Sequence, residues 1–236
     1  MDATLRLAAY FDAHQVAIGK VVDFDPAADK LYHFNFTVTN TELDADTFSD
    51  TIKFDYWINK KLSSKLCRYG VGGYMEHRTI YARSAHFDTL DEPRRLHLGV
   101  DIWAEAGTPV YSPLPGIVHS FQNNDNFGDY GPTIVLEHRL GDLILYSLYG
   151  HLSVKSLDGL YVGKPISPNE RIATFGTVNE NGHWPPHLHF QLMFDMEGRL
   201  GDFPGVCKFS EKAIYLKIIP DPQLILKFPE AVNDPL

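Results

Sequence analysis

The sequence predicts a mainly β protein, in which a small antiparallel β-domain over residues 81–236 follows an α+β extension over residues 1–80. Before residue 80, two segments carry apolar residues at helical spacing and one segment alternates apolar with polar residues. After residue 80, short apolar stretches alternate with turns that contain Gly or Pro, which is typical of antiparallel β-domains. These turns are GTP at 107–109, PLPG at 113–116, GP at 131–132, GD at 141–142 and GKP at 163–165.

The first elements of the extension are expected to be a helix and a strand. Residues 3–15 predict a short amphipathic helix, and residues 31–39, LYHFNFTVT, predict a half-buried strand. The apolar positions are Leu5, Ala8, Ala9 and Phe11 in the helix and Tyr32, Phe34, Phe36 and Val38 in the strand.

A second helix is expected between Thr47 and Leu66, capped at its start by Asp46 or Thr47 and ended by Gly70. The following YGVGGY at 69–74 is expected to be a glycine-rich loop. It lacks the spacing and the Lys-Ser/Thr pair of a phosphate-binding loop. The apolar positions that recur at helical intervals are Phe48, Ile52, Tyr56, Leu62 and Leu66.

The β-domain is expected to contain a hairpin and a further alternating strand. Residues 133–138 and 143–152 flank an RLGD turn and predict the hairpin. Residues 187–194, HLHFQLMF, predict the alternating strand, and the segments 213–219 and 224–228 are expected to pack against the domain and close it.

Composition excludes several classes of function. The chain has 236 residues, 44% apolar and 22% charged, which suits a globular protein with a sizeable core. No apolar run is long enough for a membrane span. The formal charge of −9 argues against nucleic acid or an anionic membrane as the main partner, because both need a cationic surface. Eleven histidines are a high number for a chain of this length, so they are the first candidates for a functional site.

The termini and cysteines bear on the compartment. Asp2, Arg6 and Asp12 interrupt any apolar stretch of a secretory signal, so we expect a cytoplasmic protein. Cys67 and Cys207 form no CxxC pair. Free thiols in a reducing compartment are favoured over one long-range disulfide.

Two histidine patterns suggest a metal site. HLGVD places His97 four residues before Asp101, and HLH places His187 two residues before His189. In extended chain, residues two or four apart share one face, so each pair of side chains would point the same way. Two imidazoles and a carboxylate with an open fourth position are the ligands of catalytic zinc. The same patterns also fit histidines that line a polar sheet face and bond to one another.

The residues around these patterns resemble the lysostaphin-type (LytM-like) zinc metallopeptidases. HLGVDIWAEAGTPVYSPLPGIV, from residue 97, is similar to the first metal motif of that family. YGHLS at 149–153 resembles its Y-x-HLS segment, and PHLHFQL at 186–192 resembles its G-x-HLHFE motif. VGKPISPNERIATFG, ending at Gly176, is similar to the loop between them. The resemblance covers roughly residues 92–195.

The resemblance implies a role for each matching residue. His97, Asp101 and His189 would be the Zn²⁺ ligands. His187 would act as general base on the water, and His151 of YGHLS would stabilise the developing oxyanion. His151 follows a strand whose face it would share with core residues, so the sheet must curl or end there. The implied activity is hydrolysis of peptidoglycan-like or glycine- and D-amino-acid-containing peptides.

Other residues allow alternative interpretations. His183 forms an HxxxH with His187, which is a second possible ligand pair, although the WPP at 184–186 would not keep helical spacing. Tyr149 and Trp103 are candidates for substrate contact, but an aromatic residue beside a strand more often lies in the core. The remaining histidines are expected at the surface or in the core: His14, His33, His77, His86, His119 and His138.

Three functions remain open. The first is a zinc metallopeptidase acting on peptide-type amide bonds. The second is a zinc hydrolase of a small cytosolic amide or amine metabolite, which a narrow groove closed by residues 1–80 would favour. The third is a non-catalytic, metal-stabilised regulatory module. The expected partner is a peptide or small amide substrate, and the sequence does not indicate an oligomeric state.

Overall fold

The structure is a computed structural model that describes residues 2–14, 18–83, 87 and 91–232. The strands are β1 (Leu31–Phe34), β2 (Tyr69–Gly72), β3 (Leu96–His97), β4 (Val100–Trp103), β5 (Pro109–Tyr111), β6 (Gly116–Asn124), β7 (Gly131–Leu140), β8 (Leu143–Gly150), β9 (Pro165–Ile166), β10 (Arg171–Thr174), β11 (His187–Met193) and β12 (Val206–Cys207). The α-helices are α1 (Ala3–Ala13), α2 (Ala45–Ser49), α3 (Thr51–Lys65), α4 (Lys212–Ile218) and α5 (Gln223–Leu226). Short 3₁₀ turns are η2 (Ile80–Arg83), η4 (Val154–Leu157) and η5 (Phe209–Glu211).

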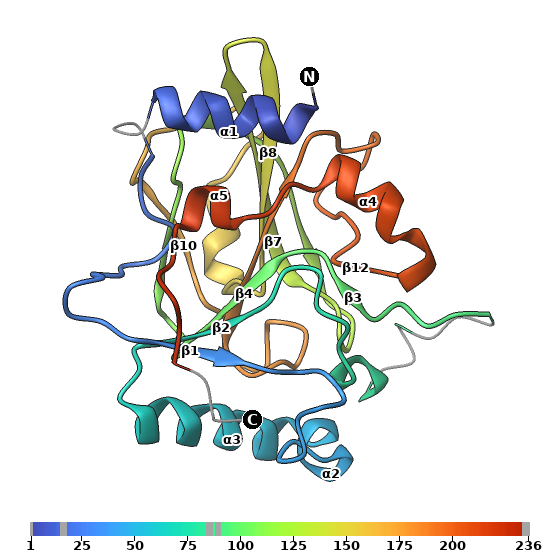
Figure 1. The fold of residues 1–236 in the computed structure, drawn as a ribbon. Coiled ribbons are helices and arrows are strands. Elements are labelled where there is room, and N and C mark those ends of the chain that lie inside the picture. The colour runs from blue at the N-terminus through green and yellow to red at the C-terminus, as the bar shows by residue number, and fades with distance from the viewer. Residues whose placement is uncertain (1, 15–17, 84–86, 88–90, 233–236) are drawn as a thin grey trace.

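The predicted mainly β architecture is confirmed. Within the described residues, eight strands form one sheet in the order β1-β2-β4-β11-β8-β7-β6-β9. All neighbouring pairs are antiparallel except β1 and β2, which run parallel. Two smaller antiparallel pairs, β5 with β10 and β3 with β12, complete the strands. Helices α1 and α3 lie at opposite ends of the molecule (Figure 1).

The predicted hairpin is the middle of the sheet. Strands β7 and β8 pair from Leu140 opposite Leu143 to Ile134 opposite Tyr149. Gly141 stands in the turn with a φ of +65°, a left-handed conformation that glycine adopts without steric cost. The strand predicted at 187–194 is also confirmed, as β11, which pairs with β8 on one side and β4 on the other.

The segment 69–74, expected to be a loop, begins instead with the buried strand β2 between β1 and β4. Glycine is required there because a Cβ on Gly70 would lie 2.1 Å from the ring of Phe34. Through β1 and β2 the sheet continues from residues 1–80 into the later chain. The division into residues 1–80 and 81–236 stays a prediction.

The strand expected at 31–39 is correct in its first half. Tyr32, Phe34 and Phe36 are buried as predicted, but β1 ends at Phe34 and Val38 is 79% exposed. The side chain of Asn35 explains the end of the strand, because its Oδ1 accepts hydrogen bonds from the backbone N–H and the hydroxyl of Thr37. This local turn takes the chain out of the sheet.

The helix expected at 47–66 is two helices, α2 and α3. Asp44 and Asp50 cap them, in place of the predicted Asp46 or Thr47, and Leu66 in the left-handed conformation ends α3 before Gly70. The predicted apolar face is wrong at three positions, because Ile52, Tyr56 and Leu66 are exposed. The buried face of α3 consists of Phe54, Ile58 and Leu62.

Helix α1 is confirmed within the described residues, with Asp2 as its N-cap. Leu5, predicted on the apolar face, is exposed, whereas the buried residues are Leu7, which the prediction did not include, and Phe11, as predicted. Both pack into the core that also contains Leu188 and Phe190 of β11. The last predicted residue of this helix, position 15, lies outside the described residues.

The alternation of β11 places the site on the sheet. Leu188, Phe190 and Leu192 enter one hydrophobic core, whereas His187 and His189 are not part of any apolar cluster. A second core lies between α3 and the sheet, and it includes Trp103 of β4. The site therefore forms on the face of β4 and β11 opposite the first core.

The remaining expectations for the chain concern its tail and its cysteines. The tail segments form α4 and α5, and the buried residues there are Ile219, directly after α4, and Ile225 of α5. Cys67 and Cys207 are both free, as predicted. No helix among the described residues combines the length and the apolar character that a membrane span requires.

Candidate metal site and active site

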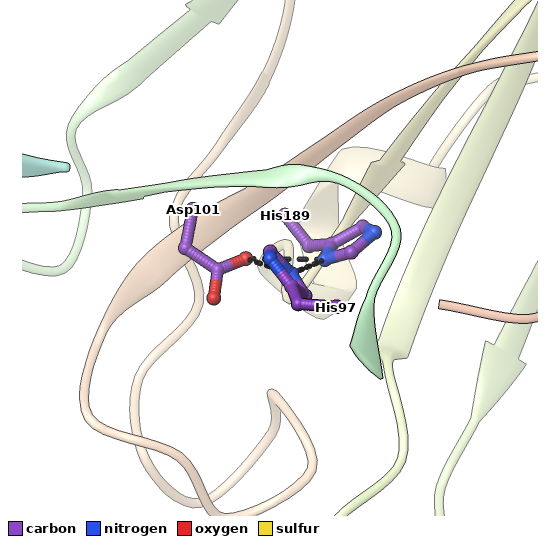
Figure 2. Close-up of side chains that lie close together, drawn as sticks. All are labelled: His97, Asp101 and His189. Carbon is purple, nitrogen blue, oxygen red and sulfur yellow. Dashed lines mark hydrogen bonds and ion pairs between the residues drawn. The ribbon is translucent and has the colours of Figure 1, made fainter. Parts of the chain in front are cut away.

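Three buried side chains from three strands meet at one point (Figure 2). His97 ends β3, Asp101 lies on β4 and His189 lies on β11, directly opposite Asp101 in the strand register. His97 Nε2 lies 3.0 Å from His189 Nδ1 and 3.2 Å from Asp101 Oδ1. His189 Nδ1 lies 3.1 Å from the same Oδ1. Among the described residues, these three form the cluster of potential metal ligands.

A bend at Gly99 brings His97 and Asp101 together. The sequence pattern suggested a continuous extended stretch, but the chain turns between β3 and β4. A Cβ on Gly99 would lie 2.7 Å from His189 Nε2 and 2.7 Å from the carbonyl oxygen of Phe190. Glycine therefore allows the close approach of this bend to β11.

Neighbouring groups fix the tautomers of both imidazoles. His97 Nδ1–H donates to the carbonyl of Gly73 at 2.9 Å, so Nε2 carries the lone pair. Gln191 donates its Nε2–H to the carbonyl of Pro204, which leaves Gln191 Oε1 to accept from His189 Nε2–H at 3.0 Å. The lone pair of His189 Nδ1 therefore also faces the cluster.

The electrostatics of the cluster suit a cation. Burial, followed by the charge of Arg78, lowers the pKa of His97 to about 4. Burial alone would raise the pKa of Asp101, but His97, Arg78 and the other imidazoles hold it well below its usual range. A neutral His97 imidazole and an ionised Asp101 carboxylate thus converge with the lone pair of His189 Nδ1, and these lone pairs repel one another unless a cation lies among them. This donor set can hold a divalent metal ion.

Two more histidines face the same point. His187 Nε2 lies 4.0 Å from Asp101 Oδ1, and its Nδ1–H donates to the carbonyl of Pro185 at 2.8 Å. His151 Nδ1–H donates to the carbonyl of Asn181 at 2.8 Å. The rings of His151 and His187 have centroids 4.2 Å apart. Burial is the main cause that lowers the pKa of His187 to about 4 and that of His151 well below its usual value.

A backbone change at the end of β8 turns His151 into the site. Tyr149 is buried in the core and receives a hydrogen bond from Ser147, so it is a core residue. Strand β8 ends at Gly150, and His151 adopts a left-handed φ of +61°. This conformation is uncommon for a side-chain-bearing residue and is found more often where function requires it. Strand β8 therefore ends directly before His151, as the predicted role of His151 required.

Four of these side chains, those of Asp101, His151, His187 and His189, border one cavity of about 340 Å³. Trp103 lines the same cavity. Many of its walls come from outside residues 95–199, on both sides of that segment. These wall residues are Arg78, Ile80, Tyr81, Phe87, Arg94, Asp202, Phe203, Pro204, Gly205, Val206, Glu211 and Tyr215.

The other histidines lie apart from this cavity. His183 is exposed and stacks on Phe127, so it does not pair with His187. His14, His33 and His77 are exposed, as predicted. His119 is half-buried, and His138 is a buried residue that contacts Ser147. His86 lies outside the described residues.

Sequence reasoning missed three residues of the site. Arg78 donates to Asp101, Tyr81 contacts Arg78 and the Tyr130 hydroxyl lies 3.3 Å from His189 Nε2. No local pattern identifies them, because each reaches the cluster from a segment far away in the sequence. The part of Gln191 in orienting His189 follows only from the hydrogen bonds.

Comparisons with known proteins agree with the motifs. The family model described as peptidase family M23 matches residues 95–199. The L-Ala--D-Glu endopeptidase of Bacillus subtilis (strain 168) is 29% identical over 110 residues, which cover 43% of this chain and 31% of that protein. This chain thus spans about a third of the length of its curated relative.

Solved structures give similar partial matches. A zinc-containing peptidase from Vibrio cholerae is 28% identical, with a TM-score of 0.34, over 42% of this chain and 27% of that one. The antimicrobial peptidase lysostaphin from Staphylococcus simulans is 26% identical, with a TM-score of 0.33, over 50% of this chain and 45% of that one. The predicted resemblance to the lysostaphin-type peptidases is thus confirmed over residues 95–199, the segment that matches peptidase family M23.

Proposed function

We propose that this protein is a zinc-dependent metallopeptidase that hydrolyses peptide-type amide bonds, with peptidoglycan-like or glycine- and D-amino-acid-containing peptides as its substrate class. The observation that carries the proposal is the convergence of three lone-pair donors, His97 Nε2, Asp101 Oδ1 and His189 Nδ1, beside two further imidazoles that line one cavity with Asp101 and His189. The match of residues 95–199 to a peptidase family supports it.

The proposed metal ligands are His97, Asp101 and His189. A zinc ion bound there would supply a Lewis acid that lowers the pKa of water from ~15.7 towards ~7. Gly73, Gln191 and Arg78 hold the three ligands in place through hydrogen bonds on the sides that face away from the cluster. The lowered pKa of His97 keeps its Nε2 lone pair free at neutral pH.

His187 is proposed as the general base. Its Nδ1–H is held by Pro185, so its Nε2 presents a lone pair toward the cluster and can take a proton from the attacking water. The resulting imidazolium would lie beside Asp101, whose charge stabilises it. The same Nε2–H can then donate its proton to the leaving amine.

His151 is proposed to stabilise the developing oxyanion. Its Nδ1–H is held by Asn181, so Nε2 also presents a lone pair in the neutral ring. It can donate a hydrogen bond to the oxyanion only after Nε2 takes up a proton. The short distance between the rings of His151 and His187 places the two imidazoles where a proton released during the reaction can reach either ring.

A second candidate is hydrolysis of a small amide or amine metabolite. The observation in its favour is the cavity of about 340 Å³, whose walls come from segments on both sides of residues 95–199. A volume of this order is at the lower end of ligand pockets, which span roughly 300–1,000 Å³. The non-catalytic module is less well supported, because all three ligand positions and both accessory histidines are present.

Purified protein incubated with zinc should be assayed on muropeptides, on glycine-rich and D-alanine peptides of increasing length, and on small N-acyl amines. Zinc-dependent cleavage of the longer peptides supports the peptidase, whereas cleavage restricted to the smallest amides supports the second candidate. Zinc binding without cleavage of any substrate would favour the regulatory module. The cytoplasmic location expected from the sequence stays a prediction.

A further inference from the structure

We infer that Arg78, which lies outside the segment that matches the peptidase family, is a positioning residue that holds Asp101 as a metal ligand. The inference rests on the proposed function, because it assumes that Asp101 binds the metal. It assigns to the chain before residue 80 a direct part in building the metal site.

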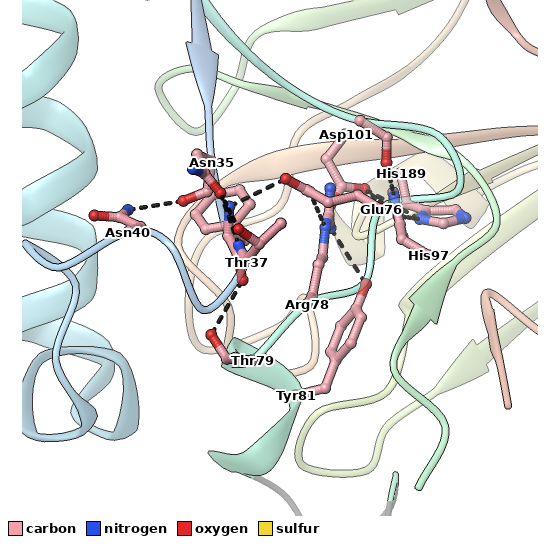
Figure 3. Close-up of polar contacts among 12 residues, drawn as sticks. Asn35, Thr37, Asn40, Glu76, Arg78, Thr79, Tyr81, His97, Asp101 and His189 are labelled. Atoms are coloured by element: carbon pink, nitrogen blue, oxygen red, sulfur yellow. Dashed lines mark hydrogen bonds and ion pairs between the residues drawn. The ribbon is translucent and has the colours of Figure 1, made fainter. Parts of the chain in front are cut away.

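The contacts of Arg78 define this role (Figure 3). The guanidinium is fully buried, and its Nη1 donates to Asp101 Oδ2. Its Nε donates to Glu76 Oε2 at 2.7 Å, and Nη1 also lies 3.2 Å from the Tyr81 hydroxyl. Asp101 therefore has one oxygen bound to Arg78 and the other, Oδ1, directed at His97 and His189.

The placement of Arg78 is not explained by stability alone. Buried ion pairs are weak evidence for stability, because removing two charges from water costs about as much as their attraction gains. In the described part of the chain, Arg78 Nη2 is buried without a hydrogen-bond partner. The adjacent Gly72 leaves room for it, since a Cβ there would lie 2.5 Å from Nη2. Such an arrangement needs a reason beyond folding.

These contacts fit a role for Arg78 in holding the carboxylate of Asp101 in position. A carboxylate held through one oxygen presents only the other oxygen to a metal. The bond from Nε to Glu76 holds the planar guanidinium in place, so that its Nη1 stays directed at Asp101 Oδ2. The positive charge also balances the carboxylate in a region from which water is excluded.

The surrounding backbone supports the neighbouring ligand in the same way. The Gly73 carbonyl accepts from His97 Nδ1–H, and the Glu76 carbonyl accepts from the backbone N–H of His97 at 2.9 Å. The Arg78 backbone N–H donates to the Arg95 carbonyl at 2.8 Å. Residues 73–78 thus hold two of the three proposed ligands.

The test compares zinc affinity, measured by competition with a chromophoric chelator, in wild type, Arg78→Gln and Arg78→Lys. We expect Arg78→Gln to lose roughly 10- to 100-fold in affinity, as is typical when a group behind a ligand is removed. Arg78→Lys keeps the positive charge but lacks the planar guanidinium, so its zinc affinity should lie between those of the wild type and Arg78→Gln. Arg68→Gln is the matched control, because Arg68 forms a similar 2.7 Å pair with Asp29 but is partly exposed and belongs to no part of the site.

A second readout separates positioning from general structural support. In protein loaded with Co²⁺, the visible absorption spectrum should change in Arg78→Gln, because a released Asp101 would bind differently, and should stay the same in Arg68→Gln. Equal zinc affinity and an unchanged Co²⁺ spectrum in folded Arg78→Gln would overturn the inference. If that variant does not fold, the same comparison is made with Arg78→Lys. A wild-type protein that binds no zinc would instead overturn the proposed function on which the inference rests.

Discussion

His187 lies flat against Trp103, with ring centroids 3.9 Å apart and planes within 15° of parallel. The two residues face each other across β11 and β4 in the strand register. Trp103 in turn packs against Phe36 and Phe54, with centroids 5.5 and 5.9 Å away. The aromatic core beneath α3 therefore sets the plane of the imidazole that we propose as the base.

Replacement of Trp103 should reduce turnover without removing the metal. In Trp103→Leu the flat surface behind His187 is lost, so the ring can tilt, and we expect kcat to fall on the order of 10-fold or more while zinc content stays at the wild-type value. Trp103→Phe keeps an aromatic plane and serves as the control. Steady-state kinetics and metal analysis test this, and a Leu variant with unchanged kcat would refute the role of the stacking.

Substitution of either histidine that is not a proposed ligand should lower activity without removing the metal. His187→Gln and His151→Gln remove a proton acceptor and an oxyanion stabiliser, so each should lower kcat/KM by about 10²–10⁴-fold on any peptide that the wild type cleaves. Zinc affinity should change little. If zinc is lost in either variant, that histidine is a ligand and the proposed assignment is wrong.

Gly99 offers a steric test of the bend that joins β3 to β4. A Cβ in Gly99→Ala would meet His189 Nε2 and the Phe190 carbonyl at 2.7 Å, so His189 must shift. We expect zinc affinity to fall at least roughly 10-fold and stability to fall by about 1–3 kcal/mol, as for other overpacked sites.

Gly73→Ala is the control for this substitution. Its Cβ would have its nearest neighbour at 3.6 Å, an ordinary contact, and the carbonyl that holds His97 is kept. Zinc titration and chemical denaturation of both variants give the comparison. Equal zinc affinities in the two variants would contradict the close approach at Gly99.

His138 predicts a pH dependence of stability away from the metal site. It is buried between the Pro115 carbonyl and Ser147, and burial lowers its pKa from 6.5 to about 4. The unfolded chain therefore binds the proton more tightly than the folded chain. The contribution of His138 to the free energy of unfolding is fully present above pH 6.5. It is lost as the pH falls toward 4, by about 3 kcal/mol in total.

Chemical denaturation at a series of pH values from 7.5 to about 4 tests this, with His138→Gln as the comparison. The wild type should lose stability more steeply than the variant over this range, by about one proton per molecule. Parallel curves for the two proteins would contradict the prediction.

The site residues could be predicted from the sequence where they lie in extended segments. The fold could be predicted where apolar and polar residues alternate regularly along a strand. His187 and His189 share a face because β11 is a regular strand, and the hairpin of β7 and β8 follows from a glycine turn. Arg78 could not be predicted, because its contact with Asp101 depends on how β2 joins the sheet. The buried strand β2 was mistaken for a loop because glycines fit against Phe34 there and mask its strand character.

The helix faces show a similar limit. The predicted apolar face of α3 included Ile52 and Tyr56, which are exposed, because several apolar stripes can be drawn on one short helix. The packing of α3 against the sheet decides which stripe is used. Asp50 starts α3 and Leu66 ends it, and between them Phe54, Ile58 and Leu62 face the sheet.

The most direct test of the account is the zinc content of the purified protein after equilibration with zinc and removal of the excess, in wild type and in His97→Ala, Asp101→Ala and His189→Ala. The account predicts one zinc per chain in the wild type and a large loss in each variant, since each removes one donor of the converging three. Wild-type protein that takes up no zinc, or single variants that retain a full equivalent, would contradict it.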